Sequence, residues 1–411
     1  MRESIKNRID AVRRGEVPEG YLSENHQLRP KDWQYEKIGK YLVSHDEFSN
    51  ETDRYPLATS SRQGLMLQSD YYSDQRYEET AGGFHVVPEG YVTYRHMSDD
   101  DIFRFNVNKM GCAVLVSPEY PVFTTSDDLH QDLLIAYLNN MKEFTAYCSA
   151  QKKGSTRTRM YFSRLGEFTM PIPSTAEQKK IVEILTTCDR ALELKQKLLE
   201  EKCRQKQWLM KKLLDPNSGV RLPGFDNSEW KTFTINDYCE CLDTRRKPVN
   251  AKNREEMKGR YPYWGATSVQ GYVNDYLFDE EIVLLAEDGG AFDEFATRPI
   301  AAFVDQKCWV NNHAHILRAK NGKTKLVYYA LAHKDIRNFI NGTTRSKLTQ
   351  ADMLSITMSL PVTESEQDAL VELFSVIDKD ISLLAQELSE WDQKKKALTQ
   401  LLLTGLVRVN A

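Results

Sequence analysis

The sequence predicts an α+β protein with a pseudo-two-fold internal repeat, in which two mixed α/β globular domains are separated by two long antiparallel coiled-coil helices. Three observations predict this fold class. The chain repeats itself at a nearly constant spacing, each copy ends in a long apolar seam, and the regions between carry short strand patterns and turn residues. The expected segments are an N-terminal segment 1–27, a globular domain 28–173, a helical segment 174–220, a second globular domain 221–361 and a C-terminal helical segment 362–411.

The internal repeat is the first of these observations. Segments of the first half recur in the second half 188 residues later, and 189 residues later after one inserted residue. The matching pairs are Gly154–Arg157 with Gly342–Arg345, Phe168–Pro173 with Ile356–Pro361, and Glu177-Gln178 with Glu366-Gln367. One register maintained over so long a stretch indicates two copies of one structural unit.

Each copy is predicted to end in a helix of a coiled coil. Steps of three and four residues connect Ile181 to Leu213 and Leu370 to Leu402, with lapses in the apolar seam at Lys195, Lys202, Lys206 and Lys395. Ser174 or Thr175 before Glu177, and Thr363 before Glu366, are typical of capping boxes. Asp215-Pro216 and Thr404-Gly405 are expected to end the two helices.

The charges of the two helices are opposite. Residues 177–214 carry ten Lys or Arg and six Asp or Glu, a net charge of +4, whereas residues 366–403 carry four Lys and eight Asp or Glu, a net charge of −4. Packing of the two helices on each other satisfies both the seams and the charges. The alternative is that each helix is an ordinary amphipathic helix docked on its own domain.

The two regions between the helices are expected to be mixed α/β globular domains. Cys112–Val116, Glu281–Ala286 and His313–Leu317 are typical of strands, and helices are expected near Gln131–Tyr147 and Lys325–Ile340. Both domains open with a Trp-led segment, at Trp33 and at Trp230. Because the C-terminal Leu-Val-Arg-Val lacks the continuation that follows the first helix, we expect the N-terminal segment to supply it, which would place the two termini close together.

The composition excludes several classes of protein. The chain has 411 residues, 41% of them apolar, and a net charge of −4, so it has material for packed cores and lacks the charge of an autonomous nucleic-acid binder. No apolar run approaches the roughly 20 residues of a membrane helix, and the charged N-terminus does not resemble a signal peptide. Seven scattered cysteines favour reduced thiols and a cytoplasmic location.

Catalytic signatures do not emerge from the sequence. There is no Asn-Pro-Pro-Phe/Tyr or Asp-Pro-Pro-Tyr tetrapeptide for amino-group methylation and no glycine-rich fingerprint for a nucleotide. Leu317 replaces the first glycine of the P-loop that Gly322-Lys323-Thr324 would complete. His313 and His315 alternate onto one face of a strand but lack a third ligand at suitable spacing, so no metal is expected. The sequence predicts a protein that is not an enzyme.

Recognition of DNA fits the pattern better. Two similar domains on a spacer suit a ligand with two sites at a fixed distance, such as duplex DNA. Polar loops with aromatic residues suit base reading, and the repeated Gly-Ser/Thr-Thr-Arg loops offer cations for phosphates. The candidate DNA-binding residues are Ser61, Arg62, Gln63, Tyr72, Arg76, Arg157, Arg159, Tyr263, Thr267, Ser268, Gln270, Arg345 and Lys347.

The chain resembles the specificity subunit of type I restriction–modification systems along essentially its whole length. Six segments carry the resemblance: Pro171–Ile181, its echo Leu360–Gln367, the two helix ends, and the stretches Val116–Phe123 and Trp309–Leu317, which are similar to segments of that family's target recognition domains.

The resemblance implies that each target recognition domain reads one half of a bipartite DNA sequence, while the helices set the spacer and dock two methyltransferase subunits. Motor-nuclease restriction subunits would complete the complex. S-adenosylmethionine, ATP and magnesium would bind the partners and not this chain. The alternatives left open are a stand-alone coiled-coil DNA-binding regulator, an interaction scaffold without a DNA role, and an enzyme in its own right.

Overall fold

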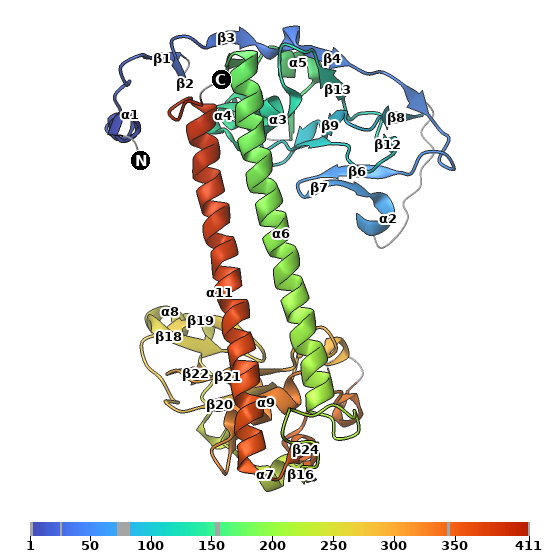
Figure 1. Ribbon diagram of the computed structural model, residues 1–411, viewed down its shortest axis with the longest axis vertical. Coiled ribbons are helices and arrows are strands. Elements are labelled where there is room, and N and C mark those ends of the chain that lie inside the picture. The colour runs from blue at the N-terminus through green and yellow to red at the C-terminus, as the bar shows by residue number, and fades with distance from the viewer. Residues whose placement is uncertain (1–2, 25–26, 72–82, 153–156, 343–345, 410–411) are drawn as a thin grey trace. The chain divides into compact units, whose positions relative to one another are not determined.

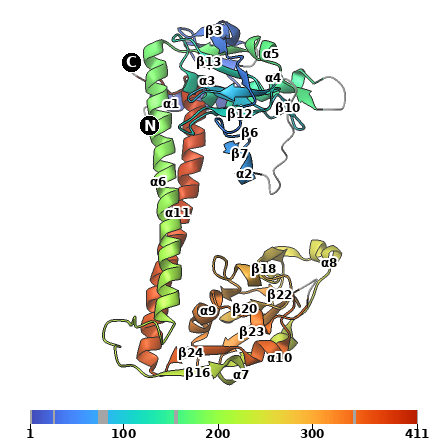
Figure 2. The same cartoon turned by 90° about the vertical axis from the view of Figure 1, so that its right-hand side faces the viewer.

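The computed structural model describes residues 3–24, 27–71, 83–152, 157–342 and 346–409 of the chain (Figure 1). It divides into two compact units. Unit 1 comprises residues 1–194 and 388–411, and unit 2 comprises residues 195–387. Each unit combines helices and short strands with a part of two long helices, which confirms the α+β class and the expected coiled coil (Figures 1 and 2).

Unit 1 begins with a helix and continues as a run of short strands closed by helices. Its elements are α1 (Glu3–Arg13), β1 (Tyr21–Glu24), β2 (Gln27–Pro30), β3 (Gln34–Lys37), η1 (Ile38–Lys40), β4 (Leu42–Ser44), β5 (Phe48–Ser49), β6 (Ala58–Ser61), β7 (Gly64–Leu67), α2 (Gln68–Tyr71), β8 (Phe84–Val87), β9 (Val92–Tyr94), β10 (Met97–Ser98), β11 (Phe105–Val107), β12 (Val114–Val116), β13 (Val122–Thr125), α3 (Gln131–Asn140), α4 (Lys142–Ala150), β14 (Thr158–Arg159), α5 (Phe162–Gly166) and β15 (Thr169–Ile172). The two larger sheets have the strand orders β11-β9-β13-β4 and β12-β8-β5, and all their pairs are antiparallel.

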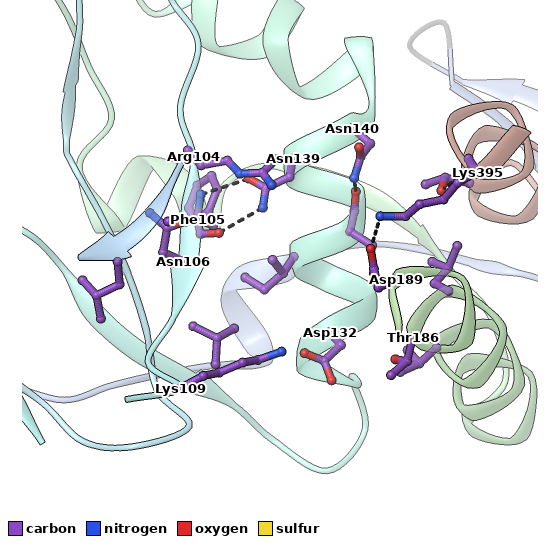
Figure 3. Close-up of a pocket in the computed structure, with 18 residues that line it drawn as sticks. Arg104, Phe105, Asn106, Lys109, Asp132, Asn139, Asn140, Thr186, Asp189 and Lys395 are labelled. Atoms are coloured by element: carbon purple, nitrogen blue, oxygen red, sulfur yellow. Dashed lines mark hydrogen bonds and ion pairs between the residues drawn. The ribbon is translucent and has the colours of Figure 1, made fainter. Parts of the chain in front are cut away.

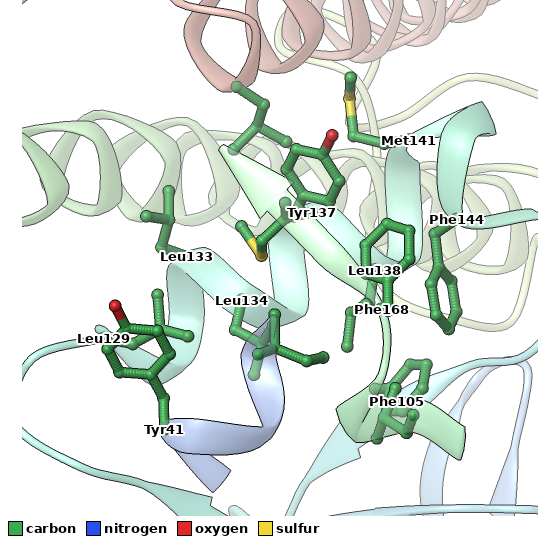
Figure 4. Packing of buried hydrophobic residues seen from close by; sticks show 14 of the residues in the cluster. Tyr41, Phe105, Leu129, Leu133, Leu134, Tyr137, Leu138, Met141, Phe144 and Phe168 are labelled. Carbon is green, nitrogen blue, oxygen red and sulfur yellow. The ribbon is translucent and has the colours of Figure 1, made fainter. Parts of the chain in front are cut away.

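The core of unit 1 lies between the four-stranded sheet and α3 with α4. Leu134, Tyr137 and Leu138 of α3 are buried together with Phe144 of α4 and Phe168 (Figure 4). The ring centroids of Phe144 and Phe168 are 5.0 Å apart at a steep angle, as aromatic pairs prefer. Apolar positions at helical spacing therefore build this core as the sequence pattern predicts.

The prediction of a single helix near Gln131–Tyr147 is wrong, because two helices occupy this stretch. Met141, which is 5% exposed, adopts an extended conformation (φ −95°, ψ 127°) and separates α3 from α4. The break has a packing reason, because it turns Phe144 and Cys148 of α4 toward the core that the apolar face of α3 already occupies. No Gly or Pro marks the break in the sequence.

Unit 2 is built on a four-stranded sheet with the order β17-β23-β20-β21 and a three-stranded sheet with the order β19-β18-β22. Its elements are β16 (Trp230–Thr234), α7 (Ile235–Tyr238), β17 (Cys239–Cys241), η2 (Asp243–Arg245), α8 (Ala251–Glu256), β18 (Lys258–Trp264), β19 (Val269–Val273), β20 (Ile282–Ala286), η3 (Phe292–Glu294), β21 (Ala301–Val304), β22 (Trp309–Val310), β23 (Ala314–Ala319), α9 (Thr324–Ala332), η4 (Arg337–Phe339), α10 (Gln350–Ser355) and β24 (Thr357–Pro361). The expected strands near residues 112–116, 281–286 and 313–317 are confirmed as β12, β20 and β23. The helix expected over Lys325–Ile340 is shorter and ends at Ala332.

Two long helices, α6 (Thr175–Leu213) and α11 (Glu364–Leu403), pack on each other within each unit. In unit 2, Lys195 pairs with Glu387 at 2.8 Å and Lys206 with Asp378 at 2.5 Å, so the helices run antiparallel. In unit 1, Lys395 pairs with Asp189. Three of the seam lapses are therefore interhelical ion pairs, and the opposite charges of the helices meet as expected.

The internal repeat recurs in three dimensions where each long helix begins. Strand β3 pairs with β15 in unit 1, and β16 pairs in the same way with β24 in unit 2. The side chain of Gln178 donates to the carbonyl oxygen of Pro173 at 3.0 Å, and Gln367 donates to that of Pro361 at 2.7 Å. Corresponding residues of the two copies thus make the same strand pairing and the same hydrogen bond.

The N-terminal segment and the C-terminal tail meet in unit 1, as expected. The hydroxyl of Tyr21 donates to the carbonyl oxygen of Gly405 at 2.6 Å. Arg408 lies over the ring of Trp33 and donates to the carboxylates of Asp32 and Glu177 at 2.7–3.0 Å. The reciprocal capping box expected at Glu177 is wrong, because Ser174 accepts from the Glu177 amide while the carboxylate bonds Arg408 and the Trp33 indole instead.

In the part of the chain that the structure describes, none of the helices combines the length and the apolar character that crossing a lipid bilayer requires. All seven cysteines are among the described residues, and each is a free thiol. Burial raises the pKa of Cys148, Cys239 and Cys308 to about 12, so these three thiols are inert packing groups.

Candidate nucleic-acid interface

The first group of expected DNA-binding residues lies at the tip of a hairpin in unit 1. Strands β6 and β7 pair in a register that leaves Arg62 and Gln63 as a two-residue turn. The hydroxyl of Ser61 donates to the carbonyl oxygen of Gly64 at 2.9 Å and accepts from the amide of Gln63 at 3.1 Å. Arg62 and Gln63 are exposed, so a well-ordered turn presents them to solvent.

A second expected group reaches the same place from a distant part of the chain. Strand β14 pairs with β10, with Arg159 opposite Met97 and Thr158 opposite Ser98. The loop that follows β10 connects both groups: Asp99 accepts from Nε of Arg157 at 2.7 Å, and Asp100 accepts from Nη2 of Arg62 at 2.5 Å. The structure therefore brings Arg62 and Arg157 together, although 95 residues separate them in the sequence.

A hollow of about 450 Å³ lies beside this hairpin, and its lining includes Ser61, Arg62 and Gln63. Arg95 and Arg104 line it as well. Three arginines line one open hollow together with the polar residues Thr59, Ser60 and Ser98, which is a chemistry suited to phosphates and base edges. Arg95 and Arg104 were not expected at this site from the sequence, because neither lies in a repeated motif or in a turn-rich loop.

A second hollow, of about 430 Å³, adjoins the first and shares Arg104 with it (Figure 3). One wall belongs to β11 and α3, where Asn139 accepts from the amide of Phe105 and donates to its carbonyl oxygen, both at 2.9 Å. The other wall belongs to α6 and α11, with the ion pair between Asp189 and Lys395. Arg104 thus lies between the hollow beside the hairpin and the helix pair of unit 1.

Two carboxyl groups of the loop after β10, those of Asp100 and Asp101, have pKa values below their ordinary value. The Arg62 guanidinium holds the pKa of Asp100 below its ordinary value, with help from the Ser98 hydroxyl and the Ile102 amide. The Thr158 hydroxyl lowers the pKa of Asp101, and Lys152 acts in the same direction. The buried ring of His96 lies nearby, and desolvation lowers its pKa despite the opposing charge of Glu119.

In unit 2, the hairpin of β18 and β19 carries another expected group. Thr267 and Ser268 lie in its turn, where the amide of Gly265 donates to the carbonyl oxygen of Ser268 at 2.9 Å. Gln270 is exposed on β19 and accepts from Arg254 at 3.5 Å. These three side chains are presented at one end of the hairpin.

Tyr263 departs from the expectation, because it is 2% exposed. Its hydroxyl accepts from the amide of Val249 at 3.0 Å, and the Arg254 guanidinium lies 4.9 Å from the ring centroid. A side chain buried in this way offers no group to a ligand, so we reassign Tyr263 from contacting DNA to positioning the segment before α8. An aromatic residue in a polar stretch signals either role, and only packing distinguishes them.

Lys347 lies above a buried charged cluster. Its ammonium is 3.4 Å from Glu287, which also accepts from Arg246 at 2.7 Å. Below them, Asp243 accepts from His315 at 2.6 Å, and the other ring nitrogen of His315 lies 3.0 Å from the carbonyl oxygen of Leu348. Burial raises the pKa of Asp243, but the hydrogen bonds from His315 and the Ile316 amide, with the charge of Arg246, leave it below the ordinary value.

This cluster also has the residue types of a metal site. Asp243, Glu287 and His315 offer ligand atoms that all lie within 4.8 Å of one another. However, Arg246 donates to Glu287 and lies 3.3 Å from Asp243, and Lys347 is near Glu287, so the carboxylates are already neutralised by side-chain cations. The cluster therefore fits an anchor for Lys347 and Leu348 better than a cation site.

Three expected residues lie outside the described part of the chain: Tyr72, Arg76 and Arg345. The expected residues that are described fall into two groups. Ser61, Arg62, Gln63, Arg157 and Arg159 lie together in unit 1, and Thr267, Ser268, Gln270 and Lys347 lie on unit 2.

Comparisons with known proteins agree with this arrangement. A family model described as "Type I restriction modification DNA specificity domain" matches residues 85–201 and 227–391. A type I restriction enzyme specificity subunit of Haemophilus influenzae is 36% identical over 137 residues, which are 32% of this chain and 33% of that relative. The chain thus matches about a third of the length of that relative.

A longer match covers nearly the whole chain. The MjaVIII specificity subunit of a type I restriction enzyme in Methanocaldococcus jannaschii is 23% identical over 94% of this chain and 96% of its own length. Among solved structures, the S subunit of a type I restriction–modification system from M. genitalium has a TM-score of 0.57 at 16% identity, over 95% of this chain and 100% of that one. The last match indicates a shared fold.

Proposed function

The chain belongs to the family of type I restriction–modification specificity subunits, and from this premise we propose that each of its two globular domains reads one half of a bipartite DNA target. The domain of unit 1 would read with the hairpin of β6 and β7, and the domain of unit 2 with the hairpin of β18 and β19. The residues at the two tips differ, Ser61-Arg62-Gln63 in one and Thr267-Ser268 with Gln270 in the other, so the two half-sites should differ as well.

One observation carries this proposal furthest. Segments 95 residues apart converge on one hollow in unit 1 and place Arg62, Arg95 and Arg104 along it, with Arg157 at its edge. A chain with a net charge of −4 gains a local concentration of cations only by such folding. Arginine is the side chain that best combines phosphate contact with bidentate reading of guanine.

The long helices support the remaining part of the proposal. Helices α6 and α11 contain 39 and 40 residues, about 60 Å of helix each at the usual rise of 1.5 Å per residue. We assign them two tasks, setting the length of the nonspecific spacer between half-sites and docking two methyltransferase subunits. Trp208 and Leu198 of α6 and Val376 of α11 are exposed apolar side chains of the kind that a partner would cover.

Catalysis belongs to the partners in this proposal. Methyl transfer from S-adenosylmethionine would occur on the methyltransferase subunits, acting on an adenine flipped out of each half-site. ATP and magnesium would serve motor-nuclease restriction subunits. This chain would contribute no reacting group and would only select where the partners act.

The proposal can be tested by mapping DNA methylation. The chain is co-expressed with methyltransferase subunits of a type I system in a host that lacks adenine methylation, and methylated adenines are mapped across the genome. We expect one bipartite, asymmetric motif that is methylated only when this chain is present. Exchanging residues 28–173 for the corresponding domain of a relative should change one half of the motif and leave the other half intact.

Two results would refute the proposal. Methylation of the same motif without this chain would place specificity in the methyltransferase. Tight, sequence-specific DNA binding by the chain alone, with no methyltransferase copurifying, would instead identify a stand-alone regulator.

A further inference from the structure

The loop Asp99–Asp101, here called the acidic loop, holds the two best-placed cations of the unit 1 surface. Asp100 accepts from Arg62 at 2.5 Å and Asp99 accepts from Arg157 at 2.7 Å. Both arginines carry the type of group that contacts DNA phosphates, yet each faces a carboxylate of its own chain. The acidic loop therefore occupies the position that a phosphate would take.

The acidic loop is held in place independently of the arginines. Oδ1 of Asp100 also accepts from the Ser98 hydroxyl at 2.9 Å and from the Ile102 amide at 3.4 Å. Asp101 has a φ of +64°, a conformation that aspartate tolerates better than most residues, and it bonds the hydroxyl of Thr158. The carboxylate of Asp100 would therefore stay where it is if Arg62 turned toward another anion, and the residues on its C-terminal side keep the loop that carries Asp99 in place.

Two other arginines that line the same hollow are not paired with a described carboxylate. Arg95 and Arg104 line it with Arg62, and within the described ranges no carboxylate oxygen lies within 4.0 Å of either guanidinium. The hollow thus has two kinds of arginine, one kind open to a ligand and one kind already paired. A surface shaped only for maximal attraction to DNA would not place acidic residues among its cations.

Resting on the proposed function, we propose that the acidic loop is a specificity determinant, an internal phosphate mimic that competes with nonspecific DNA for Arg62 and Arg157. A random duplex offers only phosphates, and each phosphate contact at these two arginines must displace an aspartate. A cognate half-site adds base contacts that favour the displacement. The loop lowers binding to all sequences by a similar factor. Wrong sequences, which lack the base contacts, are therefore the first to fall below the affinity that supports methylation.

The exposure of these ion pairs sets the size of the effect. The side chains of Arg62 and Asp100 are 64% and 44% exposed, and those of Arg157 and Asp99 are 54% and 71% exposed. Exposed pairs of this kind are weak and exchange easily, so each should change nonspecific affinity by about twofold to fivefold. Two phosphates gained by the released arginines should make the salt dependence steeper by roughly two contacts.

The test compares a D99N/D100N variant with wild type in the full chain bound to its methyltransferase subunits. Asparagine keeps the shape of each side chain and removes its charge. The control is D46N/E51Q, which removes two charges from the same unit, where Asp46 accepts from Ser44 and Glu51 pairs with Arg54 away from the hollow. Fluorescence anisotropy measures binding to a duplex that contains the methylated motif and to a scrambled duplex, over about 50 to 200 mM salt.

We expect D99N/D100N to bind the scrambled duplex about fourfold to twenty-five-fold more tightly than wild type, with a steeper salt dependence and a similar gain for the duplex that contains the motif. The control should match wild type within about twofold. The genome of cells carrying D99N/D100N should also show methylation at sites that differ from the motif by one base.

Three outcomes would overturn the inference. Unchanged or weaker binding to the scrambled duplex would show that the aspartates do not compete with phosphates. An equal gain in the control would reduce the effect to net charge. A changed base preference without a change in nonspecific affinity would mean that the aspartates read cytosine directly. Failure of the wild-type complex to bind either duplex would refute the proposed function itself, which is a different result.

Discussion

The contact between Arg408 and Glu177 offers the sharpest test of how the chain closes on itself. Arg408 donates two hydrogen bonds to Glu177 and two to Asp32, and its guanidinium lies 5.7 Å from the ring centroid of Trp33. These contacts raise the pKa of Arg408 and lower that of Asp32. Replacing Arg408 by Met keeps the aliphatic packing on Trp33 and removes the charge. We expect Arg408→Met to loosen the C-terminal tail and the start of α6.

The magnitude follows from burial. The Glu177 side chain is 4% exposed, and without Arg408 its carboxylate would keep, among the described residues, only the hydrogen bond from the Trp33 indole at 2.9 Å. Removing one partner of a fully buried pair costs about 3–5 kcal/mol, but Arg408 is 34% exposed and water can reach Asp32, so we expect about 2–3 kcal/mol. For a unit of this size that loss corresponds to a decrease in Tm of about 5 to 10 °C.

The second copy of the repeat provides a matched control. Arg221 lies 5.2 Å from the ring centroid of Trp230, as Arg408 lies over Trp33, but it donates to backbone carbonyl oxygens and not to a carboxylate. Arg221→Met should therefore cost less than about 1 kcal/mol. Removing the buried charge as well, in Arg408→Met with Glu177→Gln, should recover at least about 1 kcal/mol.

Hydrogen exchange of residues 175–185, with thermal unfolding of the same variants, measures these differences. Equal losses for Arg408→Met and Arg221→Met would refute the reasoning. So would a double variant that is no more stable than Arg408→Met alone, because the penalty would then not arise from an unpaired buried carboxylate.

Four further predictions concern the recognition surfaces and the helices. Inserting seven residues between 194 and 195 and seven between 387 and 388 keeps the heptad register and lengthens each helix by about 10.5 Å. The spacer between the methylated half-sites should then grow by about three base pairs. An unchanged spacer would show that the helices do not set its length. Arg157→Ala should weaken cognate and scrambled duplexes alike, by about threefold to tenfold, and reduce the salt slope by about one; a changed motif contradicts a phosphate role. Tyr263→Phe should destabilise unit 2 by about 1 kcal/mol in thermal unfolding and leave the methylated motif unchanged, unless this hydroxyl reads a base after all. Because the pKa of Asp243 in the folded chain lies below its ordinary value, its charge stabilises unit 2 above about pH 4, and this stabilisation is lost as the pH falls further. Asp243→Asn should therefore be less stable than wild type at pH 7, and its stability should depend less on acid pH. An unchanged dependence of stability on acid pH would count against this role.

Much of the fold could be read from the sequence because it depends on local periodicity. The three- and four-residue steps from Ile181 and from Leu370 predicted α6 and α11, and the opposite net charges predicted their pairing. The nearly constant spacing between Phe168 and Ile356, and between Gln178 and Gln367, identified the repeat. The strand pairs β3 with β15 and β16 with β24 realise it in the structure. Periodic apolar positions and charges recur many times along each helix, so the prediction of the helix depends little on any single residue.

The candidate site depended on information of another kind. Nothing in the sequence near Arg62 indicates that its partner is Asp100, or that Arg95 and Arg104 line the same hollow. Sequence pattern alone marked Tyr263 as a contact residue and Glu177 as a capping residue, and packing assigned them to a core and to an ion pair.

The sequence by itself determined the repeat, the two long helices and the class of residue at each tip. Only the tertiary structure decided which arginines line the hollow unpaired with any described carboxylate and which face an aspartate of the same chain. The physical reason is that periodicity specifies which face of an element is buried, whereas a contact between side chains far apart in the sequence depends on the path of every element between them.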